Sequence, residues 1–123
     1  MNRKEAATKF LTMAGTGDIR AAFEKFAAPD FIHHNQYFKG DRQSLMEAME
    51  SAHETSPNKV IDIMHIYEDG DTVITHSLVT RQARTEPDIA AVHIFRFEGA
   101  RVVELWDVFQ FQEENSPNEH GLF

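Results

Sequence analysis

The chain has no cysteine, no cluster of basic residues and no long apolar run. Without cysteine it can form no disulfide, no thiolate nucleophile and no cysteine-ligated zinc or iron–sulfur site. The 20 Asp and Glu residues outnumber 12 Lys and Arg, for a net charge of −8, whereas nucleic-acid binding needs a basic face. No stretch resembles a signal peptide or a transmembrane helix. We therefore expect a soluble, cytoplasmic protein that binds neither nucleic acid nor membrane.

Several catalytic motifs are absent as well: a phosphate-binding glycine loop, a nucleophile elbow and a dinucleotide fingerprint. The chain has 123 residues, of which 41% are hydrophobic and 26% charged. This length and composition predict a single globular domain over residues 1–123. The 10 Phe residues, against 2 Tyr and 1 Trp, suit a core, an apolar pocket or a subunit interface.

The first half of the chain has helical patterns. Apolar residues at helical spacing predict one helix over residues 4–14, a short second helix after Asp18 and a third after Asp41. Gly15, Pro29 and Pro57 mark the three helix ends. Between the second and third helices, residues 31–38 are expected to be extended, with Gly40 ending the segment.

The second half has strand patterns. Residues 60–68 and 72–81 flank Asp69-Gly70 as a hairpin, and residues 89–97 and 101–112 form a second hairpin around Gly99, after a polar loop at 82–88. Helices followed by an antiparallel meander predict an α+β fold with the helices on one sheet face. Because the strands are apolar on both faces, we expect a homodimer formed through the outer sheet face.

Asp107 is the strongest candidate for chemistry. If residues alternate along the last strand, Asp107 shares a face with Val103, Leu105 and Phe109. A carboxylate among apolar side chains resists ionisation and can then exchange a proton near neutral pH. The alternative is a structural Asp that is hydrogen-bonded to a neighbouring strand or an Arg. Trp106, on the opposite face, is expected to pack in the interface.

Three histidines and an amide could assist Asp107. His76 shares a face with Ile74 and Leu78, so its ring is expected to face the same cavity as Asp107. His93 shares a face with Ala91 and Phe95. His34 and Asn35 could hydrogen-bond a substrate carbonyl, whereas His33 should point the other way. Each of these residues could instead be structural.

Residues 95–110, FRFEGARVVELWDVFQ, together with His34-Asn35…Gly40 and residues 70–76, resemble the SnoaL-like polyketide-cyclase branch of the nuclear-transport-factor-2-like (NTF2-like) superfamily. The resemblance covers nearly the whole chain. It implies a cone of three N-terminal helices packed on a curved antiparallel or mixed sheet, with an apolar pocket at the open end. The chain departs from the pattern at Leu105, where the branch often has His, at His93, where it often has Asp, and at Gln36, where it usually has Pro.

The resemblance implies a general acid/base role for Asp107, in a reaction that uses no metal or cofactor. It also implies that His93 faces the same cavity. We expect His93 and His76 to assist it, and a small apolar carbonyl compound to bind against His34, Asn35, Leu105, Phe95 and Phe109. The reaction would be an aldol cyclisation, an isomerisation or a hydration. The alternative is an NTF2-like module that binds a small molecule without catalysis. A metal site is not expected, because the His spacing lacks a ligand motif.

Overall fold

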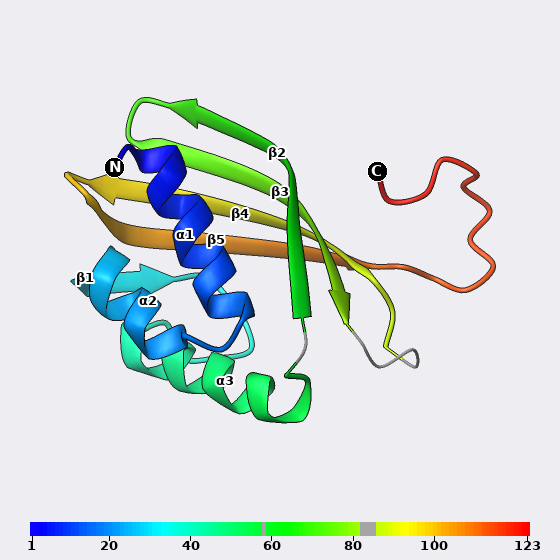
Figure 1. Cartoon of the computed structure of the whole chain (residues 1–123), viewed down its shortest axis with the longest axis horizontal. Coiled ribbons are helices and arrows are strands. Elements are labelled where there is room, and N and C mark those ends of the chain that lie inside the picture. The colour runs from blue at the N-terminus through cyan, green and yellow to red at the C-terminus, as the bar shows by residue number, and fades with distance from the viewer. Residues whose placement is uncertain (58, 82–85) are drawn as a thin grey trace.

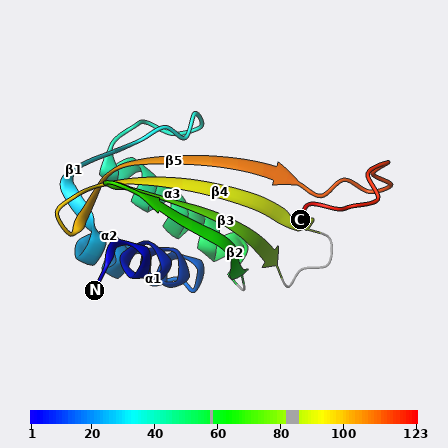
Figure 2. The same ribbon diagram turned by 90° about the horizontal axis from the view of Figure 1, so that it is seen from above.

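Residues 1–57, 59–81 and 86–123 are described by the structure, a computed structural model. The elements follow in the order α1 (Arg3–Gly15), α2 (Ile19–Phe26), β1 (Ala27–His33), α3 (Arg42–Thr55), β2 (Lys59–Asp69), β3 (Thr72–Arg81), β4 (Ile89–Glu98) and β5 (Arg101–Phe111). The three helices cover one face of a curved sheet, as the two ribbon views show (Figures 1 and 2). We call this covered face the inner face and the opposite one the outer face. The predicted α+β fold is confirmed.

The five strands lie in the order β1-β5-β4-β3-β2. The chain from β2 to β5 is an antiparallel meander, and β1 joins β5 in parallel. The sheet is therefore mixed. The parallel pairing brings the end of β1, at His33, beside Leu105 of β5.

Local signals explain where most elements begin. The Asp41 carboxylate accepts a hydrogen bond of 3.0 Å from the Ser44 backbone N–H, so it is the N-cap of α3 as predicted. Asp18 precedes α2 but makes no capping bond through its side chain. Both hairpin turns contain a glycine in the left-handed region, Gly70 with φ of 60° and Gly99 with φ of 58°, a conformation that costs glycine little.

Two boundaries differ from the sequence prediction. The strand expected over residues 31–38 begins earlier, at Ala27, and ends at His33. Residues 36 and 37 form a turn instead, because the ring of His33 and the side chain of Asn35 satisfy the backbone there. Residues 82–85 of the predicted polar loop lie outside the described residues.

The core lies between the helices and the inner face. Phe10 of α1 joins the layers: its ring centroid is 5.2 Å from that of Phe23 in α2 and 6.0 Å from that of Phe95 in β4. Phe23 in turn packs at 5.6 Å on Phe31 of β1. This aromatic chain fixes the helices over one half of the inner face.

The other half of the inner face extends past the helices. In both ribbon views the start of β4 and the end of β5 project beyond the helix layer (Figures 1 and 2). Phe109 and Phe111, on this projecting part of β5, are 48% and 51% exposed. We call this uncovered half the open end. Among the described residues, no helix is long and apolar enough to cross a membrane.

The tail after β5 turns back toward the sheet (Figure 1). Its last residue, Phe123, packs on His76 of β3 with ring centroids 4.5 Å apart. The sequence left open whether this tail closes the cone, covers a partner or hangs free. It contacts the sheet on the outer face.

Candidate functional site

Asp107 lies on the inner face of β5, where the covered half of the sheet meets the open end. Its carboxylate Oδ2 accepts a hydrogen bond of 3.0 Å from Asn35 Nδ2, and the side chain is half-buried. As predicted, Asp107 shares its face with the buried Leu105 and with the exposed Phe109. The register shifts beside Val103, and Val102 is the residue that pairs with the inward-facing Phe97 and belongs to the core. An amide donor and apolar neighbours thus surround a carboxylate that solvent still reaches.

His93 of β4 pairs with Asp107 in the sheet register, so the two side chains share the inner face. Burial lowers the pKa of His93 from 6.5 to about 4, although the charge of Asp107 acts in the opposite direction. The Nδ1 atom is buried and has no hydrogen-bond partner in the described part of the chain. His93 is therefore a neutral imidazole with an unused polar atom beside the carboxylate.

Thr75 and Ser77 of β3 extend this polar row, and the sequence analysis missed both. Thr75 pairs with His93 and Ser77 with Ala91, so both point to the inner face. Both residues are 0% exposed, and neither hydroxyl has a hydrogen-bond partner among residues 1–57, 59–81 and 86–123. Buried polar groups are normally paired. Here Thr75 and His93 lie in register with Asp107, Ser77 lies one inward-facing position further along β3, and the unpaired atom of each is closed to solvent.

The prediction that His76 faces the same cavity as Asp107 is wrong. His76 pairs with Val92, which puts it on the outer face, where its Nδ1 lies 3.1 Å from Nδ1 of His65. The sequence indicated the wrong face because Ile74 and Leu78, which share the face of His76, are larger and more apolar than the inward-facing Thr75 and Ser77.

His34 and Asn35 point to opposite faces, so they do not form the predicted pair. Asn35 reaches Asp107, whereas His34 Nε2 lies 2.6 Å from Glu104 Oε2 on the outer face. The His34 ring also stacks on Trp106, with centroids 4.9 Å apart and planes 7° from parallel. Trp106 lies opposite Asp107, as predicted.

Two of the predicted ligand contacts belong to the packed core. Phe95 is 0% and Leu105 4% exposed, so both lie on the predicted face but beneath the helices. Phe109 lies at the open end, where its ring centroid is 5.8 Å from that of His93. Of these three residues, it is the one that solvent and a ligand can reach.

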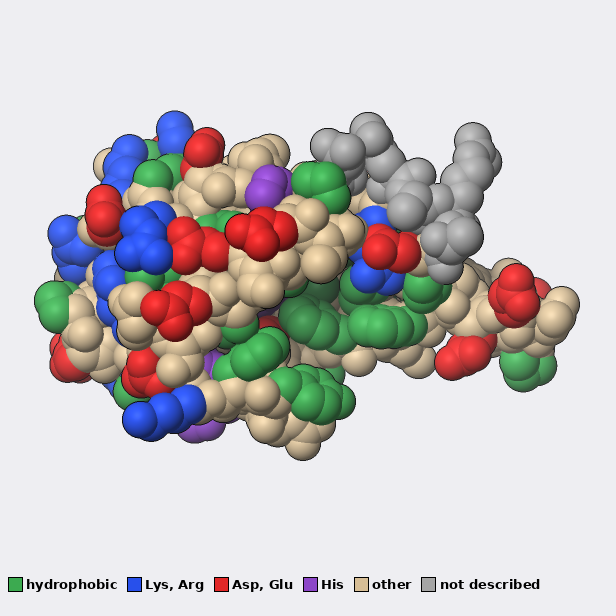
Figure 3. Space-filling model, turned by 90° about the horizontal axis from the view of Figure 1, so that it is seen from below, with side chains coloured by type: hydrophobic (Ala, Val, Ile, Leu, Met, Phe, Trp, Pro, Cys, Tyr) green, Lys and Arg blue, Asp and Glu red, His purple; other side chains and the backbone are tan. Residues whose placement is uncertain are grey.

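Exposed aromatic residues lie at the open end and in the turn after Asn35. Tyr37 and Phe38, in the turn after Asn35, are 78% and 46% exposed and join Phe109 and Phe111 as accessible apolar groups. Seen from below, hydrophobic side chains gather where the middle of the molecule is hollowed (Figure 3).

Two surface hollows lie away from Asp107. The larger, of about 460 Å³, lies between β1 and the start of α3 and is lined partly by Asp30, Asp41 and Arg42. The smaller, of about 170 Å³, lies between the end of α1 and the start of β2. We place the site at Asp107, because paired and unpaired polar side chains converge there. In the described ranges, no three His, Asp or Glu side chains come together as a metal site would require.

Comparisons with known proteins support the fold. The model of the SnoaL-like domain family matches residues 7–105, a range that ends two residues before Asp107. No curated protein matches the chain in sequence. Among solved structures, IdmH, a candidate polyketide cyclase from Streptomyces antibioticus, is 15% identical with a TM-score of 0.77, covering 89% of this chain and 93% of that one.

Two further structures are similar in fold. A candidate polyketide cyclase from Acidithiobacillus ferrooxidans is 20% identical over 86% of each chain, with a TM-score of 0.74. An NTF2-like protein of unknown function from Cytophaga hutchinsonii is 15% identical, with a TM-score of 0.70, covering 89% of this chain and 91% of that one. At these identities the likeness establishes the fold alone, which is the NTF2-like fold that the sequence predicted.

Proposed function

Because the chain belongs to the family of SnoaL-like domains, we propose that its open end binds a small apolar carbonyl compound on which Asp107 moves a proton. The observation that carries the proposal is the 3.0 Å hydrogen bond from Asn35 to Asp107, beside a neutral His93 with an unpaired buried nitrogen. Two proteins of the same fold are candidate polyketide cyclases, and polyketides carry the carbonyl groups that this proposal requires.

The proposed chemistry begins with proton abstraction. The Asp107 carboxylate takes a proton from the carbon next to the substrate carbonyl, and the electron pair of that C–H bond forms an enolate. The neutral imidazole of His93 donates a hydrogen bond to the enolate oxygen, and Asn35 holds the carboxylate in place. In an aldol closure the enolate carbon attacks a second carbonyl carbon of the substrate, and Asp107 returns the proton to the resulting alkoxide oxygen. In an isomerisation Asp107 returns the proton to another carbon of the conjugated system. In a hydration the carboxylate would instead take a proton from a water that adds to a C=C bond conjugated with the carbonyl, and would return it to the α-carbon.

A non-catalytic binding module is the second candidate, and one observation favours it. Leu105 stands where similar sequences often have His, and the structure buries it in the core at 4% exposure. No second proton-transfer group therefore occupies that position. In this case the same open end would hold a ligand without changing it.

Exchange of carbon-bound protons in D₂O would separate the two candidates. We would incubate the protein with a panel of aryl ketones and 1,3-diketones and follow loss of the α-proton signal by NMR. An enzyme accelerates this exchange, and Asp107→Asn should lower the rate at least about 100-fold, because general-base catalysis contributes on that scale. Asp62→Asn, at an exposed acid of β2, is the matched control and should keep the wild-type rate. Equal rates for Asp107→Asn and wild type would contradict the proposed role.

We also propose a homodimer formed through the outer face. Val108 on β5, and Tyr67 and Val60 on β2, lie on the outer face and are 62%, 59% and 50% exposed, which is costly for large apolar groups on a sheet unless they are covered. Val108→Asp should convert a dimer into a monomer in sedimentation equilibrium. A wild-type protein that is monomeric at all concentrations would contradict the dimer.

A further inference from the structure

The short segment that follows β1 is held on both faces of β5. The backbone N–H of His34 donates to the carbonyl oxygen of Leu105 at 3.1 Å. From this point the His34 side chain turns to Glu104 on the outer face, and the Asn35 side chain turns to Asp107 on the inner face. Two adjacent residues thus bind β5 through side chains on its opposite faces.

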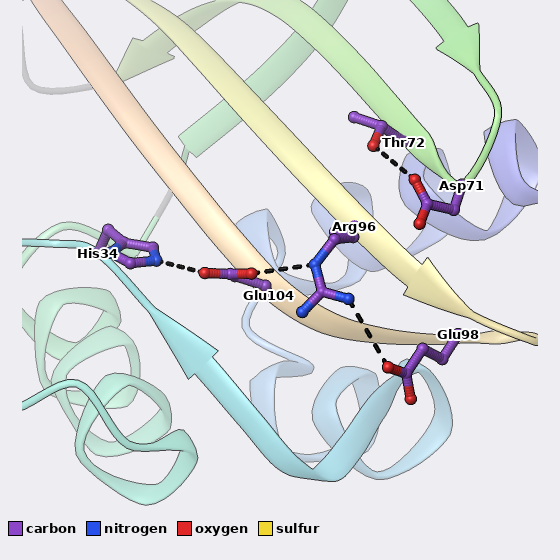
Figure 4. A network of polar contacts seen from close by, with 6 residues as sticks. All are labelled: His34, Asp71, Thr72, Arg96, Glu98 and Glu104. Carbon is purple, nitrogen blue, oxygen red and sulfur yellow. Dashed lines mark hydrogen bonds and ion pairs between the residues drawn. The ribbon is translucent and has the colours of Figure 1, made fainter.

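The contact on the outer face, between His34 and Glu104, is shorter than the 3.0 Å contact between Asn35 and Asp107 on the inner face. Glu104 Oε2 lies 2.6 Å from His34 Nε2, and Glu104 Oε1 accepts a 3.0 Å bond from Arg96 Nε. Arg96 also pairs with Glu98 at 3.7 Å, and the close-up shows the four side chains in a row (Figure 4). The hydrogen bond from His34, and then that of Arg96, lower the pKa of Glu104. The Glu104 carboxylate therefore stays charged and binds His34 through a charge-assisted hydrogen bond.

On the inner face, the bonds that Asn35 makes within the turn leave its NH₂ group to bind Asp107. The Asn35 backbone N–H donates to His33 Nδ1 at 3.1 Å, and its Oδ1 accepts from the Tyr37 N–H at 3.0 Å. The other nitrogen of the His33 ring lies 2.7 Å from the Lys39 carbonyl oxygen, which closes the turn. With its oxygen occupied by the turn, the amide can present only its NH₂ group to Asp107.

We propose that Glu104 is a positioning residue for the Asp107 site: through His34 it fixes the segment that holds the Asn35 amide against the Asp107 carboxylate. Glu104 lies on the opposite face of β5 and touches no reacting atom. The inference rests on the proposed function of Asp107 for its catalytic meaning. The geometric part, in which the outer-face hydrogen bond between His34 and Glu104 sets the orientation of the inner-face Asn35 amide, can be tested without any substrate.

The test is the side-chain amide of Asn35 in ¹⁵N-labelled protein. In Glu104→Gln, the Asn35 NH₂ resonances should move toward their positions in Asp107→Asn, and their hydrogen exchange should become roughly tenfold faster as the bond to Asp107 weakens. Glu98→Gln is the matched control, since it removes a carboxylate from the same row without touching His34. Glu98→Gln should leave the Asn35 amide resonances unchanged. The side-chain amide resonances of Asn2 should be unchanged in every variant.

A second variant tests the proposal if Glu104→Gln folds poorly. His34→Ala keeps the Glu104–Arg96 pair and should produce the same change at Asn35. Unmoved Asn35 resonances in either folded variant, or equal movement in Glu98→Gln, would overturn the proposal. If Asn35 moves but Asp107→Asn exchanges ketone protons at the wild-type rate, the positioning role stands and the proposed function fails.

Discussion

The inner and outer faces of β3, β4 and β5 carry opposite chemistry, although the same three strands supply both. At the centre of the inner face, small hydroxyl side chains and a neutral imidazole lie beside Asp107, and three of their polar atoms are buried without a partner in the described residues. The outer face has large apolar groups and ion pairs whose polar atoms contact one another.

This difference separates two tasks. Polar atoms that hydrogen-bond to one another, as those of Glu104, His34 and Arg96 do, stabilise a structure, but they have little capacity left to hydrogen-bond a ligand. The unpaired atoms of Thr75, Ser77 and His93 have bonding capacity left, which is why we place binding and chemistry on the inner face. The outer face is then left for the association with a second copy and the positioning of Asn35 that we propose.

The largest expected effect is on the free energy of unfolding, and it distinguishes the covered half of the inner face from the open end. Phe95→Ala should lower the free energy of unfolding by about 3–5 kcal/mol, because the ring is fully buried against Phe10. Phe109→Ala, at the exposed open end, should cost less than about 1 kcal/mol. Urea unfolding of the two variants measures both values, and similar losses would mean that the open end is part of the core.

A smaller effect concerns pH and His93. The pKa of His93 is about 4 in the folded protein and 6.5 as a free side chain, so the unfolded chain binds a proton between these values and the folded one does not. Stability should therefore fall as pH decreases from 6.5 to 4, by on the order of 3 kcal/mol from this residue. Urea unfolding over this range should show that His93→Gln removes this part of the loss.

The outer-face histidine supplies the control for that experiment. His76→Gln leaves His93 in place, so it should keep the loss that His93 causes. If the stability of His93→Gln falls with decreasing pH as steeply as that of the wild type, His93 is not buried as a neutral imidazole. The comparison of the two faces would then lose its main electrostatic difference.

Much of the fold could be predicted from the sequence, because its signals are local. The Asp41 cap, the glycine turns at Gly70 and Gly99, and the helical spacing of residues 4–14 each depend on a few neighbouring residues. The start of β1 at Ala27 was not predictable in this way. Its partner is β5, more than 70 residues later, and two alanines after a helix carry no strand signal of their own.

The candidate site was predicted only in part. Asp107 and His93 lie together on the inner face: strand alternation predicted the face of Asp107, and the family resemblance implied that of His93. Asn35 joins them, although it was expected to act together with His34. On β3 the usual rule that apolar residues face inward gave the wrong face, so His76 was included and Thr75 and Ser77 were missed. His34 and Asn35 are adjacent, and only the structure shows that β5 passes between their side chains.

The central claim is that ligands bind on the inner face, and selective ¹⁵N labelling of histidine tests it most directly. The imidazole signals of His93 and His76, assigned with the two Gln variants, report on opposite faces of the sheet. On titration with a 1,3-diketone such as benzoylacetone, the account predicts that the His93 signals move while those of His65 and His76 stay fixed. Movement of the His65 and His76 signals, or saturating binding that leaves His93 unchanged, would contradict it.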